Sequence, residues 1–398
     1  MNTTITKTRI ESIDIVRGLA MIIMALDHVR DFFHITAFTD DPLNLATTTP
    51  LLYFTRWITH FCAPIFVFLS GTSIYLQSLR KSKKELSIFL IKRGLWLIFV
   101  EFVIISFSWS FDPFYHFIYL QVIWAIGISM VLLGLLIHLP YKLILALGLI
   151  IVFGHNLLDI PEAAPGFKAG FWWELLHHSN WSDVAVTTNH HVIIIYPFVA
   201  WTGVMMLGYC AGIFFTPKFS VSQRQKIIMQ LGIGLIVLFV VLRFLNVYGD
   251  PFPWSSQKDS FTTFLSFMKI HKYPPSLLYL CITIGPALLL LSFIENIKNR
   301  FTNMLVVFGR TAFFYYILHF FLIHILLAIA FYAQGNTTQQ AMDSMQKLPF
   351  LFAIPDQGFG LAMVYAVWMF VIVALYPLCK WYDRYKTSHK EKWWLSYL

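Results

Sequence analysis

Long apolar segments separated by short polar connections dominate this chain. A run of about 20 apolar residues is long enough to cross the hydrocarbon core of a bilayer as a helix. The pattern predicts ten such spans, of which the fifth is the shortest: 13–33, 53–79, 86–107, 117–139, 141–158, 191–215, 227–248, 274–294, 301–333 and 359–381. We therefore expect an all-α fold, a polytopic integral membrane bundle of about ten transmembrane helices that forms one domain over residues 1–398.

Composition supports this interpretation. Of the 398 residues, 58% are hydrophobic and only 12% are charged. A soluble domain of this size cannot keep so much apolar surface away from water, so most of the chain is expected to lie among membrane lipids. The net charge is +9, but lysine and arginine gather in short loops between apolar runs. That distribution favours membrane orientation and argues against a nucleic-acid partner.

The basic residues also predict which side of the membrane each end occupies. In a ten-span arrangement the basic short loops fall on one side, together with Lys7 and Arg9 of the N-terminal tail and the basic C-terminal tail. The longer connections 159–190, 249–273 and 334–358 fall on the other side and are poorer in lysine and arginine. Short loops rich in lysine and arginine stay in the cytoplasm, so both termini are expected to be cytoplasmic.

The first span differs from an ordinary membrane helix because its sequence, RGLAMIIMALDHVRDFFH over residues 17–34, contains several ionisable groups. Arg17 and His28 are eleven residues apart, which is about 20° more than three full turns, so they share one face of the helix. They are separated by about 16 Å along the axis. Ionisable groups at such depths face the interior of a bundle and mark functional sites. We expect Arg17 near the cytoplasmic side and His28 near the exoplasmic side.

Two carboxylates flank His28 in the sequence. Asp31 lies one turn beyond it and is expected to accept a ring N–H, which would leave the other ring nitrogen free to act as a base. Asp27 points about 100° away and is expected to pair with Arg30 instead. An alternative interpretation places these residues at the level of the lipid headgroups, on the end of an unreactive helix.

The second span begins near the same surface, where Arg56 and His60 lie one turn apart. We expect them to complete a polar pocket that accepts the substrate, together with the polar residues at the end of the first span: Asp27, His28, Arg30, Asp31 and His34. For Lys272, at the start of the eighth span, we favour a side chain that extends toward the membrane interface, with a place in the site as the alternative.

No metal site is expected. His319 and His324 are five residues apart and do not share a helix face, and the four cysteines have no CxxC spacing. The chain also contains no GxGxxG, Walker, GxSxG or HExxH motif. Nucleotide hydrolysis, hydride transfer and zinc proteolysis therefore have no support in the sequence.

Several segments together resemble a known family, the bacterial relatives of heparan-alpha-glucosaminide N-acetyltransferase, including the YeiB-like proteins. The segments are RIESIDIVRGLAMIIMALDHVRDFF, TRWITHFCAPIFVFLSGTSIYL, GVMMLGYCAG, KYPPSLLYL, FGRTAFFYYILHFFLIH and YPLCKWYDRYK, and they extend over nearly the whole chain. The spacing of Arg17 and His28 is also similar to a first-helix motif of the acyltransferase-3 membrane enzymes.

This resemblance implies acyl transfer across the inner membrane of a bacterium. Acetyl-CoA would supply the acyl group from the cytoplasm, and a small-molecule or glycan hydroxyl or amine would receive it on the other side. His28 would act as general base or as an acyl-carrying nucleophile. Five basic residues would attract the CoA phosphates: Arg17, Arg80, Lys92, Arg93 and Arg310.

The resemblance also leaves one position open. The lysosomal enzyme has an asparagine where this chain aligns His28, and its catalytic histidine lies further along, where His34 is the nearest counterpart. We favour His28 because its spacing from Arg17 places it on the interior face.

Two other functions fit the same ionisable groups. A transporter or proton-coupled exporter would use them as a proton relay, and a non-catalytic scaffold would not need them at all. Small residues at Gly203, Gly208 and Gly212 permit close helix contact, within one chain or in a homodimer.

Overall fold

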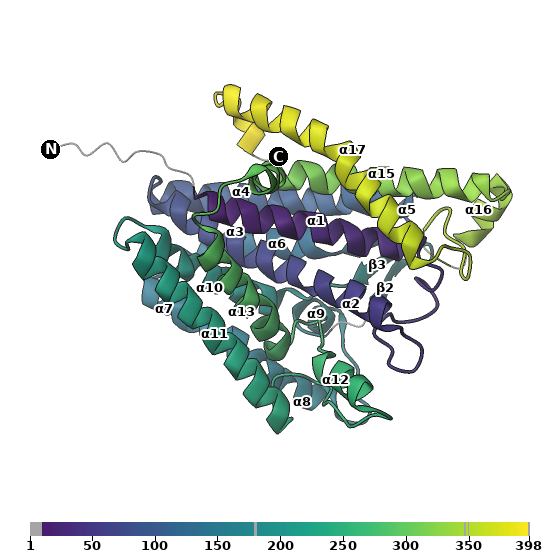
Figure 1. The fold of residues 1–398 in the computed structure, drawn as a ribbon, viewed down its shortest axis with the longest axis horizontal. Helices are drawn as coiled ribbons and strands as arrows, with labels where there is room; N and C mark the ends of the chain where they lie inside the picture. The colour runs from purple at the N-terminus through teal and green to yellow at the C-terminus, as the bar shows by residue number, and fades with distance from the viewer. Residues whose placement is uncertain (1–9, 179–180, 346–347, 349, 397–398) are drawn as a thin grey trace.

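The computed structural model describes residues 10–178, 181–345, 348 and 350–396. Lys7 and Arg9, which contributed to the predicted orientation, lie outside the described residues. The described chain is mostly helical (Figure 1). Its α-helices are α1 (Glu11–Phe33), α2 (Pro50–Ile58), α3 (Cys62–Ser78), α4 (Lys83–Val100), α5 (Ser106–Ser110), α6 (Val122–Leu136), α7 (Tyr141–Gly154), α8 (Asp159–Glu162), α9 (Phe171–Leu176), α10 (Phe198–Ala211), α11 (Val221–Leu245), α12 (Ser260–Met268), α13 (Leu277–Ile294), α14 (Arg300–Arg310), α15 (Ala312–Ala333), α16 (Thr338–Ser344) and α17 (Leu361–Ser388).

Among the described residues, seven helical segments are long and apolar enough to cross a membrane: Pro50–Ser78, Tyr141–Glu162, Phe198–Phe215, Val221–Leu245, Leu277–Ile294, Ala312–Ala333 and Leu361–Ser388. The other predicted spans correspond to α1 and α4, which carry more charge, and to α6, which is shorter but apolar. The protein is therefore an integral membrane protein. The count of ten spans and the cytoplasmic location of both termini stay predictions.

Two predicted spans begin as β-strands, which corrects the expectation of helix at these positions. β1 (Phe117–Leu120) pairs in parallel with β3 (His190–Ile194), and β2 (Ser182–Thr187) pairs antiparallel with β3. β1 and β3 are short runs rich in β-branched and aromatic residues, and Gln121 and Pro197 separate them from the helices that follow. Apolar runs this short do not distinguish strand from helix by periodicity. The small sheet lies outside the helical spans.

α1 runs through the middle of the bundle (Figure 1), and α14 packs closely against it. A Cβ atom on Gly18 would collide with the backbone carbonyl of Leu305, and one on Gly309 would collide with that of Asp14. Only glycine permits the two backbones to approach in this way, as in other tightly packed membrane helices. The predicted span 301–333 is divided at Thr311 into α14 and α15.

A buried carboxylate fixes the start of α6. Glu101 begins a π-helical turn after α4, and its carboxylate accepts the backbone N–H groups of Gln121 (3.1 Å) and Trp124 (3.0 Å). The first N–H groups of a helix have no partner within the helix and carry a partial positive charge, so a carboxylate is stable there. Glu101 is thus a structural cap.

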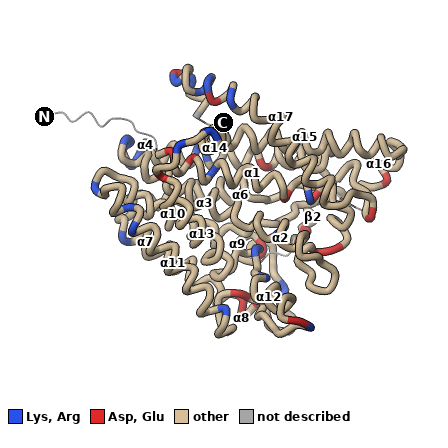
Figure 2. The backbone as a smooth tube through the Cα atoms, viewed as in Figure 1, with Lys and Arg blue, Asp and Glu red and all other residues tan. Residues whose placement is uncertain are grey.

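Basic and acidic residues are distributed unevenly between the ends of the bundle. In Figure 2 lysine and arginine gather at the ends of the bundle near the starts of α4, α7 and α14, whereas aspartate and glutamate are prominent near α8, α12 and α16. This asymmetry agrees with a cytoplasmic side at the first of these ends. We refer to the opposite end as the exoplasmic side.

Candidate active site

Two histidines from distant helices form a pair inside the bundle. Nδ1 of His28, on α1, lies 2.7 Å from Nε2 of His319, on α15. The other nitrogen of His319, Nδ1, lies 3.1 Å from the backbone oxygen of Tyr315. A carbonyl oxygen only accepts, so His319 carries its proton on Nδ1 and, when neutral, accepts the Nδ1–H of His28 at Nε2. This hydrogen-bond network assigns the tautomers and leaves Nε2 of His28 unprotonated, as a base requires.

The partner of His28 is therefore His319 and not Asp31, which corrects the prediction from the sequence. Asp31 is bound by Arg30 at 2.5 Å, and the same guanidinium also contacts Asp27 at 3.0 Å, as expected. A full positive charge on the adjacent residue attracts a carboxylate more strongly than a neutral imidazole does. His319 was not assigned a role from the sequence because nothing local to either segment reveals that α1 and α15 meet.

Aromatic side chains enclose the ring of His28. Phe320 stacks on it with a centroid separation of 4.3 Å. Trp109 and Tyr316 contact it in edge-on geometry, with centroid separations of 5.9 and 6.4 Å. The indole N–H of Trp109 and the hydroxyl of Tyr316 are both buried and have no hydrogen-bond partner within the described part of the chain. Buried donors are normally paired, so these two are available to a bound ligand beside His28.

A cavity of about 280 Å³ opens on the cytoplasmic side of this pair. Four basic residues line it, namely Arg17, Arg93, Arg310 and Lys386, together with apolar side chains such as Met21 and Ile126. Arg17 donates to Ser73 Oγ at 2.9 Å, and Arg310 contacts Asp383 at 3.0 Å. Of the predicted CoA-binding residues, Arg80 and Lys92 are exposed and do not line the cavity.

The cavity does not reach His28. Tyr316 lines its wall and also contacts the His28 ring, so the cavity ends one aromatic side chain short of the imidazole. A molecule that enters from the cytoplasmic side therefore meets the basic residues first and Tyr316 last. For a group in the cavity to reach Nε2 of His28, the Tyr316 ring has to move.

Charged residues gather on the exoplasmic side of His28. Asp27 is bound by Arg56 at 2.5 Å as well as by Arg30. Lys272 is buried rather than extended to the interface, which corrects the expectation for this residue, and its ammonium lies 4.9 Å from the centre of the Tyr273 ring. Its charge acts on both Asp27 and His28. Lys272 therefore belongs to the candidate site.

Tyr273, in the turn before α13, shows the effect of this positive charge. Burial alone would raise the pKa of its phenol, but the charges of Lys272 and Arg56 outweigh burial and hold the pKa below its ordinary value. Perturbed titrating groups of this kind are common in functional sites. Sequence reasoning did not single out Tyr273, because the shift in the pKa of its phenol depends on Arg56, which is far away in the chain.

The two remaining predicted histidines are placed differently. His60 is buried beside the charged residues, with its ring 5.4 Å from that of Tyr279, and its Nδ1 has no partner among the residues the structure describes. His34 follows the end of α1, where its ring bonds to Thr36 at 3.0 Å. The structure thus brings His60 to the site, whereas among the described residues the ring of His34 does not contact that of His28.

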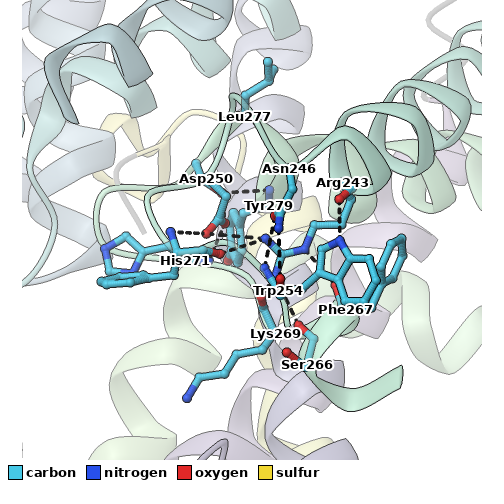
Figure 3. Close-up of polar contacts among 12 residues, drawn as sticks. Arg243, Asn246, Asp250, Trp254, Ser266, Phe267, Lys269, His271, Leu277 and Tyr279 are labelled. Carbon is cyan, nitrogen blue, oxygen red and sulfur yellow. Dashed lines mark hydrogen bonds and ion pairs between the residues drawn. The ribbon is translucent and has the colours of Figure 1, made fainter. Parts of the chain in front are cut away.

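A buried arginine fixes the loop that delivers Lys272 and Tyr273. Figure 3 shows Arg243 at the centre of this loop, where its guanidinium donates to the backbone oxygens of Phe252 (2.9 Å), Phe267 (2.9 Å), Ser266 (3.1 Å) and Lys269. Asp250 accepts the backbone N–H of His271 at 2.9 Å and the hydroxyl of Ser276 at 2.8 Å. These bonds hold both ends of the loop, so Lys272 has a defined position.

Together these features describe a polytopic membrane protein with an imidazole pair between a basic cytoplasmic cavity and a charged exoplasmic cluster. A model of the catalytic region of heparan-alpha-glucosaminide N-acetyltransferase matches residues 9–248, which is more than half of the chain. The chain belongs to this family, which implies an acetyltransferase. The matched region includes Arg17, His28 and Arg56, whereas Lys272 and His319 lie beyond it. No curated protein matches the chain in a sequence comparison.

Proposed function

We propose that this protein transfers an acetyl group from cytoplasmic acetyl-CoA to a hydroxyl or amine of a sugar on the exoplasmic side. The observation that carries the proposal is the unprotonated Nε2 of His28, oriented by His319 and located between the basic cavity and the charged cluster. Family membership supports the class of reaction.

The basic cavity suits the acyl donor. The CoA phosphates would pair with Arg17, Arg93 and Arg310, because guanidinium groups bind phosphate through two parallel hydrogen bonds. The apolar lining would contact the less polar arm that carries the thioester. Rotation of Tyr316 would then admit the acetyl group to His28, and its hydroxyl would become available to the thioester oxygen.

Two routes use the same nitrogen of His28. In direct transfer, Nε2 removes the proton of the acceptor amine or hydroxyl as this group attacks the thioester carbonyl, and CoA leaves as the thiol. In a two-step route, Nε2 attacks the thioester itself, CoA leaves, and the acceptor then displaces the acetyl group from the imidazole. His319 has the same task in both, because its Nε2 accepts the Nδ1–H of His28 and stabilises the positive charge that develops on this ring.

The acceptor would bind among Asp27, Arg56 and Lys272, with His60 nearby. The two cations bind hydroxyl oxygens or an acidic group of the sugar, and the carboxylate binds an amine or hydroxyl proton. The Arg243 network keeps this side of the site in place.

The decisive test uses purified protein in proteoliposomes, with labelled acetyl-CoA on the cytoplasmic side and membrane-impermeant glucosamine on the other. We expect labelled glucosamine from the wild type and from the Lys92→Ala control, and none from His28→Ala. Label trapped on the protein before the acceptor is added, and absent from His28→Ala, would identify the two-step route. Undiminished transfer by a folded His28→Ala variant would overturn the proposal, and glucosamine movement without acetylation would support a transporter.

A further inference from the structure

A second group of donor side chains lies on the exoplasmic side, apart from His28. Asp159 and Glu162 form the two ends of α8, and His177 directly follows α9. One ligand atom from each of the three side chains lies within 4.8 Å of the others. Glu162 Oε1 is 2.8 Å from His177 Nδ1, and Glu162 Oε2 is 3.2 Å from Nδ1 of the neighbouring His178. One imidazole and two carboxylates thus lie close enough to share one ion, and the imidazole of His178 lies beside Glu162.

Each of these donors is oriented by a further contact. Asn156 donates to Asp159 Oδ2 at 2.7 Å, and the indole of Trp173 donates to Glu162 Oε1 at 2.8 Å. The second nitrogen of His177, Nε2, faces Nδ1 of His155 at 3.1 Å. Metal-binding histidines and carboxylates are typically held by such outer contacts, which fix the ring orientation and the tautomer.

Burial separates this group from ordinary surface ion pairs. His177 is only 1% exposed and His155 4% exposed, and the carboxylate of Glu162 is largely covered. The remaining nitrogen of His155, Nε2, has no hydrogen-bond partner in the described part of the chain. The two histidines are buried and the two carboxylates are partly buried, an arrangement that is costly unless a further charge balances the carboxylates. Within the described residues, neither Asp159 nor Glu162 forms an ion pair with lysine or arginine.

We propose that Asp159, Glu162 and His177 bind a divalent transition-metal ion of the zinc type. Imidazole and carboxylate are the ligands that zinc prefers after thiolate. Neighbouring ligand atoms around a tetrahedral zinc are roughly 3.4 Å apart for bonds of about 2.1 Å. The three ligand atoms lie within 4.8 Å of one another, so their side chains would have to move closer together to share one ion, with His178 or water in the fourth position. On binding, the ring proton of His177 would move from Nδ1 to Nε2, which then donates to Nδ1 of His155, and His155 would carry its own proton on Nε2.

The position of the site indicates what the ion would do. It would join α8 to the segment after α9 and so fix the connection 159–190. Asn156, which orients Asp159, also accepts the backbone N–H of Leu277 at 2.8 Å, at the first residue of α13. Tyr273 and Lys272 directly precede this helix. The ion would thus brace the wall of the charged cluster without contacting the reacting groups, and its binding does not depend on the acetyl transfer proposed above.

The test is metal binding by the full-length protein in detergent after treatment with a chelator. We expect about one equivalent of Zn²⁺ per chain in a competition assay with a chromophoric chelator, and a rise of several degrees in the unfolding temperature. Co²⁺ should give the intense visible absorption of a tetrahedral site. His177→Gln and Glu162→Gln should weaken binding at least tenfold and abolish the thermal shift.

His191→Gln is the matched control, because His191 also pairs with a carboxylate, Asp183 at 2.7 Å, but lies outside the cluster. It should bind zinc like the wild type. Equal binding by wild type and Glu162→Gln, or equal loss in the His191 control, would overturn the site. If the His177 and Glu162 variants fail to fold, Asp159→Asn takes their place as the variant with weakened binding. The Co²⁺ spectrum of the wild type then tests for the tetrahedral site directly. A wild-type spectrum without tetrahedral absorption, together with no thermal shift from Zn²⁺, would refute the proposal.

Discussion

His28 and His319 are hydrogen-bonded at 2.7 Å although 291 residues separate them in the sequence. The bond joins the first long helix of the bundle to α15, and it decides which nitrogen of His28 is free. Because His319 is itself oriented by the Tyr315 carbonyl, the protonation pattern of the pair follows from the backbone of α15. The role proposed for His28 therefore depends on a residue that lies outside the matched family region.

Replacing His319 by alanine should lower the turnover number for acetyl transfer by about 10²-fold, because a correctly oriented general base contributes 10²–10⁴-fold. The Michaelis constant for acetyl-CoA should change little, since His319 does not line the cavity. Steady-state kinetics in proteoliposomes measure both quantities. His324→Ala is the control on the same helix: it loses bonds to the carbonyls of Ser108 and Leu351, so it should reduce stability more than turnover. Unchanged turnover in the His319 variant would exclude its orienting role.

Arg17→Ala should raise the Michaelis constant for acetyl-CoA by about tenfold or more, because a hydrogen bond to a charged group contributes about 1.5–3 kcal/mol. Lys92→Ala, which removes an exposed cation outside the cavity, should leave it unchanged. Initial rates across a range of acetyl-CoA concentrations provide the comparison. Equal effects of the two substitutions would mean that general attraction, and not the cavity, recruits the donor.

Asp27→Ala should destabilise the protein by about 3–5 kcal/mol, because it leaves the buried guanidinium groups of Arg30 and Arg56 without their shared carboxylate. Unfolding in mixed detergent micelles measures the change. The double variant Asp27→Ala/Arg56→Ala should lose less than the sum of the two single variants, because the pair interacts directly. Simple additivity would show that the ion pair contributes nothing of its own.

Gly18→Ala and Gly309→Ala should both lower the unfolding temperature, since the added methyl group meets the backbone of the opposite helix. Gly234→Ala is the appropriate control, because no atom lies within 4 Å of the added carbon and alanine favours helix over glycine. It should be neutral or stabilising. Thermal unfolding of the three variants distinguishes these results, and equal tolerance at all three positions would contradict the close contact of α1 and α14.

The Tyr273 phenol should ionise at a lower pH than an ordinary tyrosine, because Lys272 and Arg56 favour its charged form despite burial. Lys272→Met should move this ionisation to higher pH. An ultraviolet titration of tyrosinate, with Tyr273→Phe as the reference, measures both. A folded pKa below the unfolded one adds stability only once the pH is high enough to ionise the phenol, and this contribution disappears as the pH falls through the folded pKa. No shift on removal of Lys272 would refute the assignment.

The sequence predicted the features that depend on local periodicity. The spacing of Arg17 and His28 placed both on one face of α1, and the proximity of Asp27 and Arg30 predicted their ion pair. Features that depend on distant contacts were not predicted. The partner of His28 was assigned to Asp31 because competition from Arg30 cannot be ranked without coordinates.

Other errors have similar causes. Lys272 was expected at the interface because its burial depends on Tyr273 and on charges from other helices. The strands at Phe117–Leu120 and His190–Ile194 were included in helices because each is a short apolar run next to a longer one, and only their mutual pairing distinguishes them.

The position of Tyr316 bears on the proton gradient across the membrane in which this protein lies. Polar groups occupy both halves of the bundle, and an open aqueous path between them would dissipate the proton gradient across the membrane. Because Tyr316 lies between the cytoplasmic cavity and His28, we expect its ring to keep the resting protein sealed against ions. Each catalytic cycle would then open the seal only while the donor itself fills the space.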